Sequence, residues 1–420
     1  MGAKSLLDYP LGKAIFIFFS FFFCMWGTSW DFPLIGISYS YVWAGLCFFS
    51  ILFFNSVKVS KSSLFIIYLL LFSFVVYFII GLPQVISSDD PPRDFVYVLN
   101  YIVKMFIGVL SFFVVLNLVR SDEEIDLFAL TIAFTSVPLI LFLYYMYFYV
   151  FNEDFIGVTI NAGTKISKNS LATALAFSLP FLFMCSPKQL VNKVTKYLGI
   201  SVILFFLIMV NSRSALLILG VESIVLFSLS KSGTVKKVGK YSISLIVLLL
   251  LVTGISLGDW IKKTGNFADG IDRVKLRELS IFETHRGFLL IEALDGFVDS
   301  AGLGNGLTTF RIRETNKGSR TEVHNEYAQL LYEQGFVGFG LLIILFYSRI
   351  RTTYRVFRNS NNRYLEASMA SLFGLGLALV FVNLINTLVF WTILGLNFAI
   401  VSYVSKEIQL KAENSSKFPS

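Results

Sequence analysis

The sequence predicts an all-α membrane protein that crosses the bilayer about twelve times and carries one long external loop containing helices. Of the 420 residues, 55% are hydrophobic and only 15% are charged, whereas a soluble domain carries about 25% charged residues. Apolar runs long enough to cross about 30 Å of hydrocarbon recur along the chain. One long polar stretch interrupts these runs, and it contains the two histidines of the chain, His285 and His324.

Each predicted span is an apolar run of roughly 20 residues, the length that an α-helix needs to cross the hydrocarbon. The first run lacks a small-residue cleavage site, so we interpret it as a retained helix and not as a removed signal peptide. The spans are predicted at 12–30, 36–55, 63–82, 95–119, 127–151, 170–186, 196–211, 213–230, 241–258, 334–350, 366–386 and 388–405. The chain then divides into transmembrane helices within 1–258, a loop over 259–335, further transmembrane helices within 336–405, and a tail over 406–420.

Lysine and arginine gather in alternate short loops, which the positive-inside rule assigns to the cytoplasm together with both termini. The basic loops contain Lys58 and Lys61; Lys188, Lys193 and Lys196; Lys231, Lys236, Lys237 and Lys240; and Arg351, Arg355, Arg358 and Arg363. This alternation places the 259–335 loop and Arg213 on the external face. It also accounts for much of the net charge of +8, so no nucleic-acid partner is expected.

Metal and cofactor chemistry find no support in the sequence. Cys24, Cys47 and Cys185 all lie in apolar stretches, with neither metal-ligand spacing nor a disulfide framework. The external loop has no paired-aspartate motif and no cluster of histidine, cysteine and aspartate with metal spacing. We therefore expect no metal and no cofactor.

The external loop has the apolar periodicity of helices. In His285–Val298, the apolar residues Phe288, Ile291, Leu294 and Val298 fall at helical spacing and predict one helix. In Thr321–Tyr332 a second helix is predicted, with Thr321 as its cap and His324 in its first turn. The residues between, Asp299–Gly306, form a glycine-rich break that is expected to be a turn and could offer backbone amides to an anion.

The loop and its neighbour offer several cations and one candidate base. Arginine suits phosphate because its planar fork donates paired hydrogen bonds and stays charged. A phosphate at the external membrane surface fits a lipid diphosphate, and His324 could act as a general base because imidazole titrates near neutral pH. The arginines are Arg213, Arg273, Arg277, Arg286, Arg311, Arg313 and Arg320.

An ordered set of motifs carries a family resemblance. Asn-Ser-Arg-Ser-Ala-Leu-Leu over 211–217 comes first, followed by His-Arg-Gly over 285–287 and Gly-Leu-Gly-Asn-Gly over 302–306. Val-His-Asn-Glu-Tyr over 323–327 and Glu-Gln-Gly over 333–335 complete the set. Together and in this order they resemble the O-antigen polymerase and O-antigen ligase superfamily, sharply over 211–220 and 284–340 and by composition elsewhere.

The resemblance implies a metal-independent, inverting glycosyltransferase in the inner membrane of a Gram-negative bacterium, with its active site facing the periplasm. Its donor would be a glycan on undecaprenyl diphosphate. Carried over by position, Arg213 and Arg286 would hold the diphosphate, and His324 would activate the acceptor hydroxyl. Further candidate substrate-binding residues are Arg311, Arg313, Arg320, Asn325, Tyr327 and Lys104, the last because a charge within the span 95–119 is costly unless it faces a cavity or a partner.

Each of these residues also has a structural interpretation. Arg213 could anchor its helix at the membrane interface, Arg286 could be solvated, and His324 could cap or pack a loop helix. The basic run of Arg311, Arg313, Lys317 and Arg320 is of a kind that is usually solvated, and His285 is interpreted as structural or solvated. Asn325 and Tyr327 could orient His324, contact sugar, or lie on a helix surface.

Three functions compete. An O-antigen polymerase would transfer the glycan to another lipid-linked repeat unit, and we favour it because the chain is rich in Phe, Tyr, Lys and Asn. An O-antigen ligase would transfer the glycan from the same donor to lipid A–core. A transporter of lipid-linked oligosaccharides is the non-enzymatic alternative, although such proteins tend to carry midplane polar residues and internal repeats. The expected partners are the undecaprenyl-diphosphate-linked glycan and membrane lipid, with a chain-length regulator left open.

Overall fold

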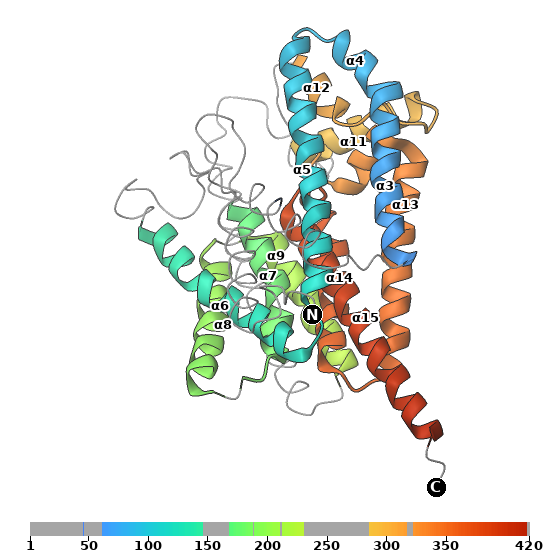
Figure 1. Ribbon diagram of the computed structural model, residues 1–420. Coiled ribbons are helices and arrows are strands. Elements are labelled where there is room, and N and C mark those ends of the chain that lie inside the picture. The colour runs from blue at the N-terminus through green and yellow to red at the C-terminus, as the bar shows by residue number, and fades with distance from the viewer. Residues whose placement is uncertain are drawn as a thin grey trace.

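The computed structural model is helical throughout the residues that it describes, which are 45, 61–145, 168–187, 189–210, 212–230, 285–316 and 322–417 (Figure 1). No strand occurs among these residues. Six of the described helices are long and apolar enough to cross a membrane, and two shorter apolar helices accompany them. The predicted fold class, a polytopic α-helical membrane protein, is therefore confirmed.

The first described helix, α3 (Lys61–Val76), continues through a π-helical turn, η3 (Tyr77–Gly81), into α4 (Leu82–Ile86). The elements that follow are α5 (Pro91–Leu118), α6 (Asp122–Tyr145), α7 (Lys168–Met184), α8 (Leu190–Val210), α9 (Arg213–Leu229), α11 (His285–Asp299), α12 (Thr309–Asn316), α13 (Glu326–Arg358), α14 (Arg363–Ala378) and α15 (Leu388–Lys417). Proline at the start of α5 suits a helix whose first backbone N–H has no intrahelical acceptor.

The candidate membrane spans are Ile66–Ile86, Pro91–Leu118, Asp122–Leu141, Leu190–Val210, Glu326–Arg358 and Leu388–Asn414, and the shorter apolar helices are Leu171–Met184 and Ser214–Leu229. The predicted spans 12–30 and 241–258, and all of 36–55 except residue 45, lie outside the described residues. The predicted span 366–386 is wrong in length, because α14 ends at Ala378 and the chain turns before α15. The segment that connects α14 to α15 is not helical because its backbone N–H groups at Leu384 and Ile385 donate to Glu326 of α13.

The described helices form two groups that α14 joins (Figure 1). α6, α7, α8 and α9 pack on one another on one side, and α5 runs along α15 on the other, while α14 contacts helices of both groups. Glycine lets α5 and α15 approach closely: a Cβ at Gly108 would lie 2.6 Å from Nε1 of Trp391. Small residues at such contacts are typical of membrane helices, which associate mainly by close packing.

The described loop helices gather at one end of the bundle. α11, α12 and the first turns of α13 lie there beside α4 (Figure 1). They share a small hydrophobic core made of Leu289, Ala293, Phe310, Val323, Ala328 and Tyr332, in which the rings of Phe310 and Tyr332 meet edge to face at 5.1 Å. This end of the molecule therefore has a small hydrophobic core in addition to the main one.

Charged side chains also lie within the bundle. Arg349 of α13 is 3% exposed, donates from Nε to Oδ1 of Asn397 at 2.9 Å, and lies 3.6 Å from the centroid of the Phe398 ring. Glu222 of α9 is 1% exposed and packs where Gly374 of α14 has no side chain. Lys104 lies partly buried in the middle of α5. Such residues are costly in a membrane unless they are paired, face a cavity, or serve a function.

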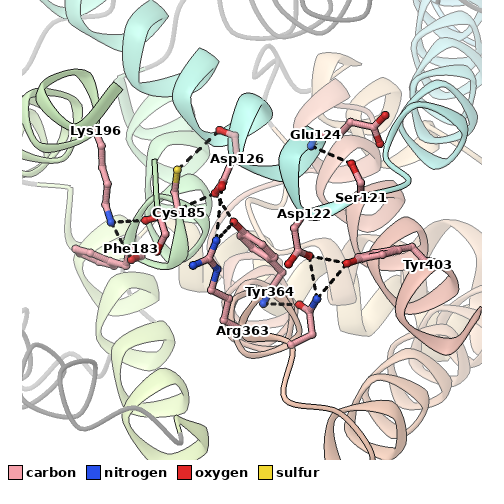
Figure 2. Close-up of polar contacts among 12 residues, drawn as sticks. Ser121, Asp122, Glu124, Asp126, Phe183, Cys185, Lys196, Arg363, Tyr364 and Tyr403 are labelled. Atoms are coloured by element: carbon pink, nitrogen blue, oxygen red, sulfur yellow. Dashed lines mark hydrogen bonds and ion pairs between the residues drawn. The ribbon is translucent and has the colours of Figure 1, made fainter. Parts of the chain in front are cut away.

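A polar network ties the start of α14 to α6 at the opposite end of the bundle (Figure 2). Asp126 of α6 accepts from the Tyr364 hydroxyl, and its Oδ2 lies 3.5 Å from a guanidinium nitrogen of Arg363. Asp122, one turn earlier, accepts from the Tyr403 hydroxyl at 2.8 Å and from the Asn362 amide at 2.9 Å. Burial and the Asp126 carboxylate raise the pKa of the Tyr364 hydroxyl, so it stays a proton donor.

Replacing Asp126 with alanine is expected to lower the free energy of unfolding by about 1–3 kcal/mol, because Tyr364 and Arg363 lose a common, partly buried acceptor. Thermal unfolding of the detergent-solubilised protein measures the change. Asp90→Ala is the matched control, since Asp90 pairs with Arg93 at 4.0 Å where both side chains are half exposed or more, and such pairs contribute little. Equal melting temperatures for the two variants would contradict the role given to Asp126.

Candidate functional site

Arg213 begins α9 directly after a tight turn from α8, as the sequence predicts. α8 ends at Val210, Ser212 has an extended backbone (ψ 100°) as the residue before the helix, and α9 starts at Arg213. Arg213 therefore lies at a helix N-terminus, where orphan backbone N–H groups and the helix dipole favour an anion. Its side chain is outside the described part of the structure.

The other predicted cations are distributed over the loop helices. Arg286 is the second residue of α11, and Arg313 lies in α12. The side chains of both are outside what the structure describes, and Arg320 lies wholly outside the described residues. Substrate binding by these arginines stays a prediction.

The predicted first loop helix is α11, although three of the residues whose spacing predicts it lie outside its buried face. Ile291, Leu294 and Val298 are 41%, 40% and 70% exposed, while Leu289 and Ala293 are fully buried against α12 and α13. α11 carries apolar residues around most of its circumference, so periodicity alone indicates more than one stripe. The contact with α13 decides which stripe is buried.

The predicted start of the second loop helix is also wrong. The helix α13 begins at Glu326, and Asn325 is its N-cap, with the Asn325 side chain accepting from the Ala328 backbone N–H at 3.1 Å. His324 precedes the helix and has a left-handed backbone with φ 56°. Residues other than glycine seldom adopt this conformation, and it persists only where the surroundings impose it.

The residues next to His324 in the chain supply that constraint. Val323, before His324, is 1% exposed in the small hydrophobic core. Asn325, after His324, is the N-cap of α13. His324 itself is only partly buried. Its neighbours are thus fixed by packing and capping, while His324 keeps part of its surface exposed.

Glu326 anchors the start of α13 to the segment between α14 and α15. Its buried carboxylate accepts from the backbone N–H groups of Leu384 at 2.7 Å and Ile385 at 3.2 Å. Its own backbone N–H donates to the Leu379 carbonyl at 2.7 Å. One residue of the His-Asn-Glu-Tyr sequence therefore satisfies backbone groups in the turn that ends α14.

Tyr327 adds a further tie to α14. Its hydroxyl donates to the Gly376 carbonyl at 2.8 Å, within the last turn of that helix. Carbonyls in a last turn have no intrahelical partner, so this bond satisfies a group that would otherwise be orphaned. Asn325 and Tyr327, predicted as substrate contacts or orienting residues, are both engaged structurally in this structure.

Arg311 pairs with Glu322, which precedes His324 in the chain. Its guanidinium lies 3.2 Å from the Glu322 carboxylate, donates to the Tyr97 hydroxyl at 2.8 Å, and stacks 4.2 Å from the Tyr97 ring centroid. Glu322 also accepts from the Asn383 amide at 3.0 Å. This predicted substrate-binding arginine therefore holds the chain two residues before His324, and substrate contact by Arg311 stays a prediction.

The glycines of the loop fit against the glycine at the break in α13. Gly302, Gly304 and Gly306 have φ of 79°, 88° and 101°, and Gly335, the non-helical residue inside α13, has φ 64° and ψ −161°. A Cβ at Gly304 would lie 2.6 Å from the Gly335 nitrogen, and one at Gly335 would collide with the Gly302 carbonyl oxygen. Two separate sequence motifs thus form one backbone-to-backbone contact, which we call the glycine lock.

The backbone amides of this turn are used inside the protein, so the predicted anion nest is wrong. Asn305 and Gly306 donate across the lock to the carbonyls of Tyr332 and Glu333 at 2.7 and 2.8 Å. The amides of 301–304 donate to oxygens of residues 297, 298 and 300. A nest needs amides that point at the ligand, and these amides hold the turn against α13.

Replacing Glu326 with glutamine is expected to lower the turnover number about 10-fold or more while the Michaelis constant changes little. The neutral amide is a weaker acceptor for the Leu384 and Ile385 amides, and loosening of the turn beside His324 costs orientation at the reacting centre. Initial rates at varied donor concentration measure both constants. Glu123→Gln, on the first turn of α6, is the control. If the Glu326 variant instead raised only the Michaelis constant, the positioning role would be wrong.

Sequence reasoning missed the distant partners of the loop. Tyr97 of α5 and Asn383, between α14 and α15, carry no motif, and no local signal connects them with Glu322. Among the described residues no group of three or more His, Cys, Asp and Glu side chains could hold a metal ion. Function without a metal or a cofactor stays a prediction.

Residues 198–343 match a protein-family model described as O-Antigen ligase. The matched segment begins in α8, contains Arg213, Arg286 and His324 in the predicted order, and ends in α13 beyond the glycine lock. No curated protein matches the chain. The match over residues 198–343 confirms the resemblance drawn from the motifs, because this segment is similar to the O-antigen ligase family.

Proposed function

We propose that the protein is an O-antigen polymerase, which transfers a glycan from undecaprenyl diphosphate to a hydroxyl group of another lipid-linked repeat unit. The O-antigen ligase family implies a glycosyltransferase-type enzyme, and the candidate membrane helices suit a lipid-linked donor. The observation that carries the proposal is the fixed, left-handed backbone of His324 within a family match that also contains Arg213 and Arg286.

The proposed step is a direct displacement with inversion. The acceptor hydroxyl oxygen attacks the anomeric carbon, the bond from that carbon to the diphosphate breaks, and His324 accepts the hydroxyl proton. Arg213 and Arg286 neutralise the departing diphosphate, which carries away the electron pair. The site would lie on the external face, as the distribution of lysine and arginine favours. The family resemblance implies that this face is the periplasmic side of a bacterial inner membrane.

A second candidate function is the ligase reaction, in which lipid A–core is the acceptor. The description of the matching family, O-Antigen ligase, favours it. Both reactions use the same donor and the same proposed residues, so the acceptor is the discriminating feature.

The test is reconstitution of the purified protein with an undecaprenyl-diphosphate-linked repeat unit, without metal and without a second acceptor, followed by separation of the products by size. The polymerase proposal expects a ladder that disappears in His324→Ala and Arg286→Ala. Absence of the ladder, with transfer once lipid A–core is added, would make the protein a ligase. Failure of both transfers in a folded preparation would contradict the enzyme and favour a transporter of lipid-linked oligosaccharides.

A further inference from the structure

The C-terminal half of α13 carries three arginines on one outward face. Arg351, Arg355 and Arg358 are spaced by one helical turn, and with Tyr354 and Asn359 they line a hollow of about 370 Å³. We call these five residues the basic hollow. All five are exposed, and no acidic residue lines the hollow. Within the described part of the chain, none of the three arginines forms an ion pair.

Topology explains the presence of arginines here but not their arrangement. Basic residues favour the cytoplasmic end of a membrane helix and complement the negative end of a helix dipole. Neither effect requires three guanidinium groups around one hollow. Planar guanidinium groups with free donors match the oxygens of a phosphate.

An exposed apolar stripe continues along α13 from the basic hollow. Phe336, Val337, Ile343, Ile344 and Tyr347 are all exposed and recur at helical spacing on the face that leads to Arg351. The opposite face, with Leu342, Leu345 and Phe346 buried, packs into the bundle. In Figure 1 this half of α13 stands at the edge of the molecule. A ligand with a phosphate and long acyl chains fits both features at once.

We propose that the basic hollow and the apolar stripe of α13 form a binding site for an anionic glycerophospholipid. The phosphodiester lies among the three arginines, and an acyl chain lies along Tyr347 and Ile344. The site is at the end of α13 away from His324, which the distribution of basic residues assigns to the cytoplasmic leaflet. It is therefore distinct from the proposed diphosphate site and does not depend on the proposed reaction.

Lipid binding to the full-length protein in detergent tests the proposal, with native mass spectrometry as the readout. Long-chain phosphatidylglycerol is expected to bind at least 10-fold more tightly than long-chain phosphatidylcholine. The triple variant Arg351→Gln, Arg355→Gln and Arg358→Gln is expected to lose at least about 10-fold in phosphatidylglycerol affinity, since each basic residue near an anionic surface contributes about fivefold.

A matched triple variant separates a specific site from net charge. Lys193→Gln, Lys406→Gln and Lys411→Gln remove the same charge from exposed positions outside the basic hollow, and they are expected to change the affinity less than twofold. Equal losses in the two triple variants would overturn the proposal. So would equal affinity for the two phospholipids.

Two further arms identify the ligand and guard against misfolding. Inorganic phosphate and short-chain phosphatidylglycerol are expected to compete at least 10-fold more weakly than the long-chain lipid. Competition as strong as that of the long-chain lipid would indicate a free-phosphate site and overturn the lipid proposal. If the arginine triple variant does not fold, Arg355→Gln against Lys406→Gln makes the same comparison, with an expected difference of about fivefold.

Discussion

Replacing His324 with alanine is expected to lower the turnover number by roughly 10²–10⁴-fold, the contribution typical of a positioned general base. The substitution removes the proton acceptor while the ties of its neighbours remain: Val323 stays in the small core, and Glu326 still binds the Leu384 and Ile385 amides. The Michaelis constant for the donor is therefore expected to change little. Initial rates with the lipid-linked donor, measured at varied concentration, give both constants.

The second histidine of the chain supplies a control for this prediction. His285, the first residue of α11, lies outside the assigned site, and His285→Ala is expected to retain activity within about threefold of the parent protein. Thermal unfolding of both variants shows that each is folded. Retention of more than about a tenth of the activity by His324→Ala would rule out a general base at this position.

The second large effect is expected at the glycine lock. Gly335→Ala is predicted to lower the free energy of unfolding by about 2–4 kcal/mol and to abolish transfer activity. The backbone of Gly335, at φ 64° and ψ −161°, belongs to a region that residues with a side chain rarely adopt. The added Cβ would also collide with the Gly302 carbonyl oxygen. Opening the lock would disturb the hydrogen bond from Phe336 N–H to Gly302, which measures 3.0 Å.

Gly340 provides the matched control on the same helix. It lies five residues beyond Gly335, and a Cβ there would meet nothing within 4 Å. Gly340→Ala is expected to leave stability unchanged or to raise it by about 0.5–1 kcal/mol, because alanine loses less conformational freedom in a helix. Thermal unfolding in detergent and the transfer assay measure both variants. Indistinguishable melting temperatures would show that the lock does not support the fold.

Much of the fold could be predicted from the local sequence. The apolar runs that became α5, α6 and α8 are long enough to cross the hydrocarbon region, and an α-helix satisfies all backbone hydrogen bonds of such a run within the segment itself. The tight turn before Arg213 and the helix at His285–Asp299 also follow from local signals. The boundaries that failed, at α14 and at the start of α13, are those where tertiary hydrogen bonds between Glu326 and the segment after α14 compete with helix propensity.

The candidate site was predictable only in part, because the sequence gives the type of each residue but not the distant residues that it contacts. His324 was identifiable as a chemical group, since it is one of two imidazoles and lies within a family motif. Its left-handed backbone was not predictable, because it depends on Val323 packing against α11 and α12 and on the Asn325 cap. Arg311 illustrates the converse, as a cation predicted for substrate is paired with Glu322 by the fold.

The sequence by itself determined that this is a helical membrane protein whose residues 198–343 resemble the O-antigen ligase family, because hydrophobic length and motif order are properties of consecutive residues. Only the tertiary structure decided that Gly302, Gly304 and Gly335 meet, that Glu326 holds the turn after α14, and that α13 exposes a basic face beside an apolar one. The physical reason is that the glycine and Glu326 contacts join residues that lie tens of positions apart in the chain. No local pattern of residues encodes which distant backbone will fill the space that a glycine leaves open. Nor does the sequence of α13 alone encode which of its faces packs against the other helices.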